Sequence, residues 1–179
     1  MFANLWRYDF RRLVLNGCSI VGRLPIYVIQ PPVSAAKRRI ICIMKKEIIR
    51  DVFFLSQPSE PAERSDLPLA KDLRDTLRAH RDGCVGMAAN MIGVRKRVII
   101  VNMGREDVVM FNPVIVSKSG PYQTEEGCLS LDGVRPTMRF KEIEVEYLDT
   151  NWKPQHRKLT DFSAQIVQHE IDHLSGKII

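Results

Sequence analysis

The sequence of 179 residues lacks most of the features that mark membrane, secreted or repeat proteins. Its four cysteines are scattered without paired spacing, as in a reduced, cytosolic-type chain rather than a disulfide scaffold. No apolar run approaches the roughly 18–20 residues that span a bilayer. No apolar stretch is followed by the small-residue cleavage site of a secretory signal. The sequence also has no internal repeat or low-complexity segment, and we expect no membrane partner.

Net charge is missing from most of the chain, although the total is +6. Residues 1–43 hold seven basic side chains and one acid, which leaves twenty basic and twenty acidic side chains for residues 44–179. The basic isoelectric point therefore reflects the first segment alone. Because a nucleic-acid-binding body would carry the excess positive charge itself, we expect no nucleic-acid partner.

The basic N-terminal extension, residues 1–43, has three prolines and no steady helical or strand period. Three interpretations stay open: an organellar transit segment, a solvated basic tail, or a stretch upstream of a true start at Met44. We favour the start at Met44, because Lys45, Lys46 and Glu47 form an ordinary N-terminus. Residues 44–179 are then one domain, which is the number expected for this length.

The body shows alternating signals for helices and strands. Cap residues, apolar spacing and a closing glycine predict helices at 66–83, 88–92 and 161–174, the last capped by Asp161. Val- and Ile-rich or alternating runs predict strands at 97–103, 108–111, 113–117 and 142–147, with a hairpin turn at 104–106. The strands do not alternate strictly with helices. We therefore expect an α+β fold whose sheet pairing is mostly antiparallel.

The most informative pattern is His169-Glu170-Ile171-Asp172-His173 in the last predicted helix. Residues four apart share a helix face, so both imidazoles can reach one metal ion. Glu170 follows the first histidine and can handle the proton of a water molecule there. The surrounding helix is apolar on nearly every side, which predicts burial, and buried polar groups need partners.

A metal held by two histidines needs a third protein ligand, and residues 174–179 offer no good one. The ligand must then lie upstream, and Cys128 in Glu126-Gly127-Cys128-Leu129-Ser130 is the best candidate. One thiolate and two imidazoles suit zinc or iron(II) and leave a fourth position for water.

These residues resemble the peptide deformylase family, which is marked by three motifs. The Glu-Gly-Cys-hydrophobic-Ser motif is complete at 126–130, and the His-Glu-hydrophobic-Asp-His motif is complete at 169–173. The remaining motif, Gly-x-Gly-hydrophobic-Ala-Ala-x-Gln, is present in altered form at 84–91. The resemblance spans roughly Met44 to Gly176 and implies antiparallel sheets packed around a central metal-binding helix.

The resemblance implies an enzyme that removes the N-formyl group from the initiator methionine of new polypeptides. It implies one divalent ion, natively Fe(II) with Zn(II) or Ni(II) able to replace it, held by Cys128, His169 and His173. Glu170 would move the water proton, and the backbone N–H of Leu129 would face the developing oxyanion. Gly86, the second glycine of the altered motif, is expected to be one of the catalytic-site residues. Asp172 would orient a metal ligand or the helix. A bacterial cytoplasm is the expected location, or an organelle if residues 1–43 are a transit segment.

Two departures from the family pattern bear on activity. Met91 stands where the family has a glutamine that donates to the formyl oxygen, and Cys84 replaces the first glycine. Losing one such donor typically slows an enzyme about 10²–10³-fold. The alternatives are therefore a deformylase-like hydrolase of another N-acyl substrate, or a metal-binding relative with little activity. The chain also ends soon after the metal motif, so ribosome docking through a C-terminal helix is not carried over.

Overall fold

The computed structural model describes residues 45–179, so the predictions for residues 1–43 lie outside the described part. The first elements are short: α1 (Val52–Leu55), the 3-10 turn η1 (Arg64–Asp66) and then α2 (Leu69–Ala79). The predicted helix at 66–83 is confirmed by α2, which buries Leu73 and Leu77 completely. No helix among residues 45–179 is both long and apolar enough to cross a membrane.

The centre of the fold is one five-stranded sheet in the order β1-β2-β3-β4-β5, with every neighbouring pair antiparallel. The strands are β1 (Gly86–Ala88), β2 (Val98–Asn102), β3 (Asp107–Cys128), β4 (Leu131–Leu148) and β5 (Pro154–Thr160). A 3-10 turn, η2 (Ala89–Ile92), follows β1 at the position of the predicted short helix. The predicted hairpin is confirmed, since Asn102 pairs with Asp107 across the turn. The α+β class with antiparallel pairing is therefore confirmed.

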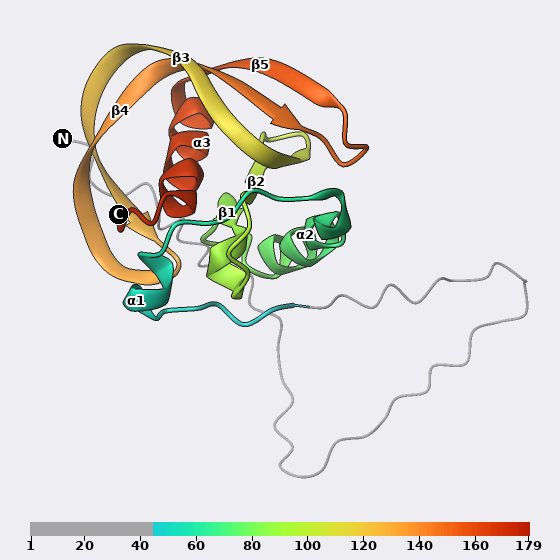
Figure 1. Ribbon diagram of the computed structural model, residues 1–179. Helices are drawn as coiled ribbons and strands as arrows, with labels where there is room; N and C mark the ends of the chain where they lie inside the picture. Colours follow the sequence, from blue (N-terminus) through green and yellow to red (C-terminus); the bar gives the residue numbers. More distant parts are fainter. Residues whose placement is uncertain (1–44) are drawn as a thin grey trace, which may run out of the picture.

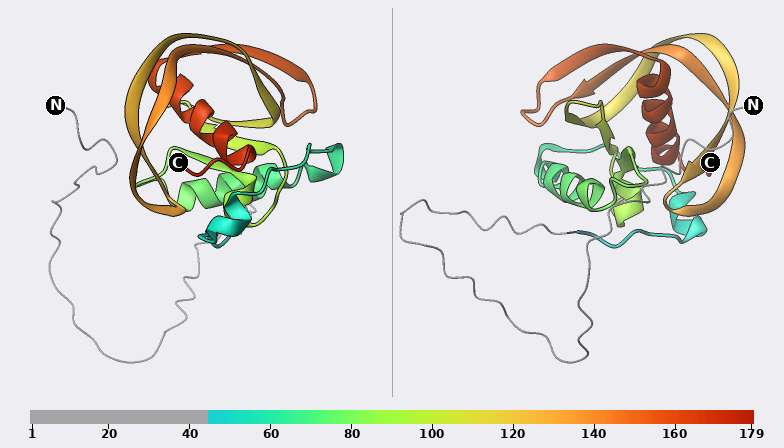
Figure 2. Two further views of the ribbon diagram at one scale, coloured as in Figure 1. Left: turned by 60° about the vertical axis from the view of Figure 1, so that its left-hand side comes forward. Right: turned by 180° about the vertical axis from the view of Figure 1, so that it is seen from behind.

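The long strands β3 and β4 arch over the last helix, α3 (Asp161–Leu174), and α2 lies beyond β2 (Figures 1 and 2). The pairing of β3 with β4 shifts register between Phe111 and Val114, between Ile115 and Ser117, and between Gly127 and Cys128. Register shifts of this kind bend and twist a strand pair. They let one continuous hairpin curve around the helix and bring its tip, at Cys128, back to it.

Helix α3 begins and ends where the sequence predicts, but its cap differs. Asp161 is the first helical residue rather than the cap, which is Thr160 and makes no side-chain cap hydrogen bond. Asp161 has a positive φ of 50°, so its backbone, not its carboxylate, makes the sharp entry into the helix. The prediction of burial on nearly every side holds for most of α3, but Phe162 in the first turn is 48% exposed.

Candidate metal centre

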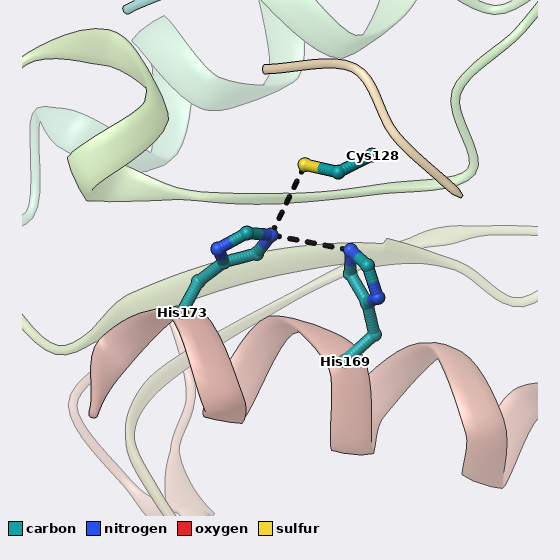
Figure 3. A group of neighbouring side chains, drawn as sticks. All are labelled: Cys128, His169 and His173. Atoms are coloured by element: carbon teal, nitrogen blue, oxygen red, sulfur yellow. Dashed lines mark hydrogen bonds between the residues drawn. The ribbon is translucent and has the colours of Figure 1, made fainter. Parts of the chain in front are cut away.

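Cys128, His169 and His173 converge at the tip of the long hairpin, with one ligand atom of each within 4.8 Å of the others. Nε2 of His173 lies 3.2 Å from the Cys128 sulfur and 3.1 Å from Nε2 of His169 (Figure 3). The histidines share one face of α3, as residues four apart do. The three predicted ligands are thus brought together from two elements, β3 and α3, and Cys128 and His173 are 45 residues apart in sequence.

The position of Cys128 depends on the tight turn between β3 and β4. Cys128 pairs with Leu131, and the backbone N–H of Ser130 donates to the Cys128 sulfur at 3.4 Å. A Cβ on the preceding Gly127 would lie 3.4 Å from the carbonyl oxygen of Gly133. The turn thus holds the sulfur toward α3, and Leu129, next in the chain, is half-buried beside it.

A buried carboxylate, Glu126, holds the first histidine. Its Oε2 lies 2.9 Å from Nδ1 of His169, and its two oxygens accept from Nε and Nη2 of Arg139 at 2.9 and 2.7 Å. Arg139 also donates to Asp172 at 2.6 Å. Burial alone raises the pKa of Glu126, but the hydrogen bonds from His169 and Arg139 outweigh it and lower the value to about 2.

The ionised Glu126 can only accept a hydrogen bond, so Nδ1 of His169 carries a proton. Nε2 of His169, the nitrogen that faces Cys128 and His173, is then the one available to a metal. Without a metal, burial lowers the pKa of His169, but the hydrogen bonds to Cys128 and Glu126 together have the larger effect and raise the pKa to about 10. Burial and the neighbouring His169 lower the pKa of His173 to about 3. The cluster therefore attracts one positive charge, which a bound cation can supply in place of the proton.

Glu170 lies beside the cluster in a tight setting. Its side chain is buried, and its Oε2 has no hydrogen-bond partner among the described residues. Burial raises the pKa of Glu170 to about 7, near the range where a group can both take and give a proton. A Cβ at Gly86 on β1 would come within 2.5 Å of Oε1 of Glu170, so only glycine leaves room for this carboxylate.

The altered motif at 84–91 packs behind the cluster. The Cys84 thiol donates to the carbonyl of Gly86 at 2.8 Å, and burial raises its pKa to about 12. The Met91 side chain is buried, and its sulfur accepts from the backbone N–H of Ala88 at 3.4 Å. Asn90 donates to the carbonyl of His173 at 2.9 Å. The donors of Cys84 and Asn90 are thus used on backbone carbonyls, and the Met91 side chain has no donor.

A small pocket opens beside His169 and Glu170. The exposed Phe162 and the buried Ile166 form apolar walls, and Gln165 adds an amide. Gln165 is itself held, because it donates to Glu126 at 2.9 Å and accepts from the Tyr122 hydroxyl at 3.1 Å. A molecule that enters this pocket therefore meets an apolar surface close to the buried carboxylate.

The sequence predicted the ligand set, Glu170 and a supporting role for Asp172. It missed Glu126 and Arg139, through which Asp172 is connected to His169. Arg139 lies in a strand with no special pattern, and its two carboxylate partners are 13 and 33 residues away. One signal was available: Glu126 and Asp172 both sit inside the two complete motifs. Two acids beside a metal site need a buried cation, and Arg139 is the one that the fold supplies.

The residues fit a divalent metal ion on chemical grounds. A thiolate and two imidazoles are a ligand set for zinc or iron(II), and one histidine already has the carboxylate partner typical of ligand histidines. The Oε2 of Glu170, beside the cluster, is buried without a hydrogen-bond partner among the described residues. Such an arrangement is costly unless a ligand completes it.

Comparison with known proteins identifies similar chains. The polypeptide deformylase family model matches residues 39–179. The chain is 52% identical over 136 residues to the peptide deformylase of Clostridium beijerinckii, covering 76% of this chain and all of the relative.

Solved structures agree with this. A peptide deformylase from Legionella pneumophila superposes with a TM-score of 0.69 at 34% identity, covering 75% of this chain and 83% of that one. A class I type b peptide deformylase from Acinetobacter baumannii, solved with Met-Ala-Ser bound, gives a TM-score of 0.67 at 31% identity and covers 75% and 96%.

Proposed function

The chain belongs to the polypeptide deformylase family, whose reaction removes the N-formyl group from newly made polypeptides, and we propose that it performs this reaction at the cluster of Cys128, His169 and His173. The observation that carries the proposal is the convergence of these three side chains beside the buried Glu170, whose Oε2 has no hydrogen-bond partner among the described residues. The family is metal-dependent, and we propose Fe(II) as the native ion, with Zn(II) or Ni(II) able to replace it. When bound, the ion supplies Lewis acidity that lowers the pKa of a water molecule and polarises the formyl carbonyl.

Glu170 is proposed to carry the proton. It accepts the proton of the attacking water and returns it to the amine that leaves as the formyl group is released. Its raised pKa, near 7 through burial, suits a group that must change protonation state twice in one cycle. Gly86 serves this step by leaving space for the carboxylate.

The apolar surface beside Glu170 is proposed to contact the side chain of the N-terminal methionine. Phe162 and Ile166 form this surface, and an unbranched thioether chain can pack on it. The Acinetobacter baumannii relative, solved with a peptide that begins with methionine, supports a methionyl peptide as the ligand class. We propose that the substrate is a formyl-methionyl peptide. Because the relatives of the chain are bacterial, we also propose that the reaction takes place in a bacterial cytoplasm.

The negative charge that develops on the formyl oxygen, as water attacks the formyl carbon, needs hydrogen-bond donors. We propose the backbone N–H of Leu129 as one, because Leu129 follows Cys128 directly in the turn. The family's glutamine donor is replaced by Met91, whose sulfur has no proton to give and already accepts from Ala88. The rate is therefore expected to be low for the family.

The test is formate release from formyl-Met-Ala-Ser by the Fe(II)-loaded protein under anaerobic conditions. We expect turnover that Glu170→Ala abolishes while metal content per chain stays the same. Acetyl-Met-Ala-Ser serves as the competing substrate for the N-acyl alternative. Stoichiometric metal without formate release, or faster cleavage of the acetyl peptide, would contradict the proposal.

A further inference from the structure

The two histidines of the cluster differ in what holds their rings. His169 is held through Nδ1 by Glu126, whereas Nδ1 of His173 is buried and has no hydrogen-bond partner among the described residues. In Figure 3 this nitrogen points away from Cys128 and His169. A histidine that binds metal through Nε2 carries its proton on Nδ1, and ligand histidines almost always donate that proton to an acceptor. The acceptor for His173 is the missing part of the site.

Asn90, in η2, brings an unpaired acceptor to this histidine. Its side chain is fully buried, and its Nδ2 donates to the backbone carbonyl of His173 at 2.9 Å. Its Oδ1 is buried without a partner among the described residues. An unpaired buried polar group is costly. Asn90 and His173 are already joined by one hydrogen bond, and each has one such group that the other could satisfy.

We propose that Asn90 is a positioning residue for His173: its Oδ1 accepts the Nδ1 proton, directly or through one water molecule, and fixes the ring for metal binding. The proposal rests on the proposed function, because only a metal-binding His173 needs its ring fixed in this way. Asparagine suits the role since its amide has both a donor, used on the His173 carbonyl, and an acceptor.

A purely structural role is the competing explanation. The last four carbonyls of a helix have no partner within the helix, and Asn90 binds one of them near the end of α3. In that case the side chain would stabilise the fold without affecting the metal. The two roles use different atoms, Oδ1 for the ring and Nδ2 for the carbonyl, so substitutions can separate them.

The experiment measures the rate at which the zinc-loaded protein gives up its ion to a coloured chelator, together with the Tm of the metal-free protein. Asn90→Leu removes both atoms, and we expect zinc release about 10–100-fold faster, the usual effect of losing such a partner. Asn90→Ala removes them without adding bulk and carries the same expectation. Asn90→Asp keeps the acceptor, so zinc release stays near the wild-type rate although Tm falls.

Thr76→Val is the matched control. Thr76 is fully buried in α2 and bridges the Lys46 N–H and the Asp72 carbonyl, away from the cluster. Its loss should lower Tm and leave zinc release unchanged. If Asn90→Leu and Asn90→Ala release zinc at the wild-type rate while their Tm is lowered, the proposal is overturned and the structural role remains. A wild-type protein that holds no zinc would instead overturn the proposed function, and the proposal with it.

Discussion

At the scale of single residues, two buried carboxylates at the cluster have opposite ionisation behaviour. Glu126 has a pKa lowered to about 2 because His169 and Arg139 outweigh its burial. Glu170 has a pKa raised to about 7 because burial dominates and its Oε2 has no partner among the described residues. Environments that separate two carboxyl groups in this way assign them different roles. Glu126 stays ionised and orients His169, while Glu170 can exchange a proton.

The space beside Glu170 gives the first prediction. Gly86→Ala would place a Cβ 2.5 Å from Oε1 of Glu170 and 2.7 Å from Ile166. The carboxylate must move, and a displacement of this size typically costs about 10²-fold in rate. We expect kcat for formyl-peptide cleavage to fall by that factor. Gly83→Ala, whose Cβ would meet nothing within 4 Å, is the control and should retain activity. Equal rates for both variants would show that Gly86 is not needed for the position of Glu170.

The missing donor at residue 91 gives the second prediction. Met91→Gln restores an N–H where the family has one, and we expect kcat to rise, by up to about 10²–10³-fold. Met91→Leu also removes the sulfur that accepts from Ala88 but adds no donor. It should show no such gain in the same formate-release assay. A similar rise in both variants would trace the effect to packing rather than to a hydrogen bond.

The sequence alone could identify the cluster because its chemistry is local. Histidines four residues apart, a glutamate between them and a glycine-flanked cysteine are visible without coordinates. The partners of these residues were not visible, since Arg139 and Asn90 reach them only through the fold.

At the scale of elements, the end of α3 is tied to the first helix by a close backbone contact. A Cβ on Gly176, just past α3, would lie 2.2 Å from the backbone oxygen of Ser56, which follows α1. Gly176 also has a positive φ of 74°. The junction therefore needs glycine for two reasons, its backbone conformation and its lack of a side chain.

Two glycine substitutions separate these reasons. Gly104 in the β2–β3 turn has a φ of 83° and open space where its Cβ would be. Gly104→Ala should cost only the left-handed strain, about 1–2 kcal/mol of unfolding free energy. Gly176→Ala should cost about 1–3 kcal/mol more, because the backbone of residue 56 has to move. Denaturant unfolding of both variants measures the difference, and equal costs would contradict the close contact.

Element prediction succeeded where the pattern was periodic and failed where it was not. Helices α2 and α3 and strand β2 have clear apolar spacing and were predicted. Strand β5 was missed because its residues are mostly polar and exposed, and it forms by pairing with β4. The part of β3 beyond the predicted strand at 113–117 was missed for the same reason, since its residues from 118 to 125 are mostly exposed. Pairing rather than burial holds those segments.

At the scale of the whole molecule, Arg139 joins β4 to β3 through Glu126 and to α3 through Asp172. This buried network links the arch to the helix that it encloses. Its charge state should therefore affect the stability of the whole fold. The lowered pKa of Glu126 predicts how the unfolding free energy changes with pH.

Acid is expected to weaken this link. The pKa of Glu126 falls from its ordinary 4.5 to about 2 on folding, so its contribution to stability is complete above about pH 4.5. The contribution is lost as pH falls toward 2, since the unfolded state takes up the proton first. For the metal-free proteins, the unfolding free energy of wild type should exceed that of Glu126→Gln at pH 6, and the gap should shrink steadily as the pH falls from 4.5 to 2. A gap independent of pH would contradict the ionised pair.

The fold class and the central position of the last helix were expected from the sequence, but the curvature of the β3–β4 hairpin was not. The lack of strict alternation between strands and helices predicted antiparallel pairing, and the family resemblance implied sheets packed around a central helix. The curvature of the β3–β4 arch depends on three register shifts between these strands, and no residue pattern in the sequence predicts them. The arch nevertheless decides function, because it returns Cys128 to the two histidines.

The central claim is that Cys128, His169 and His173 hold one metal ion, and cobalt(II) substitution tests it most directly. We predict one cobalt ion per chain and a sulfur-to-cobalt absorption band that Cys128→Ala abolishes. Cys84→Ala should keep the band, because Cys84 is bonded to the Gly86 carbonyl and is not in the cluster. A band that survives in Cys128→Ala, or that disappears in Cys84→Ala, would contradict the account.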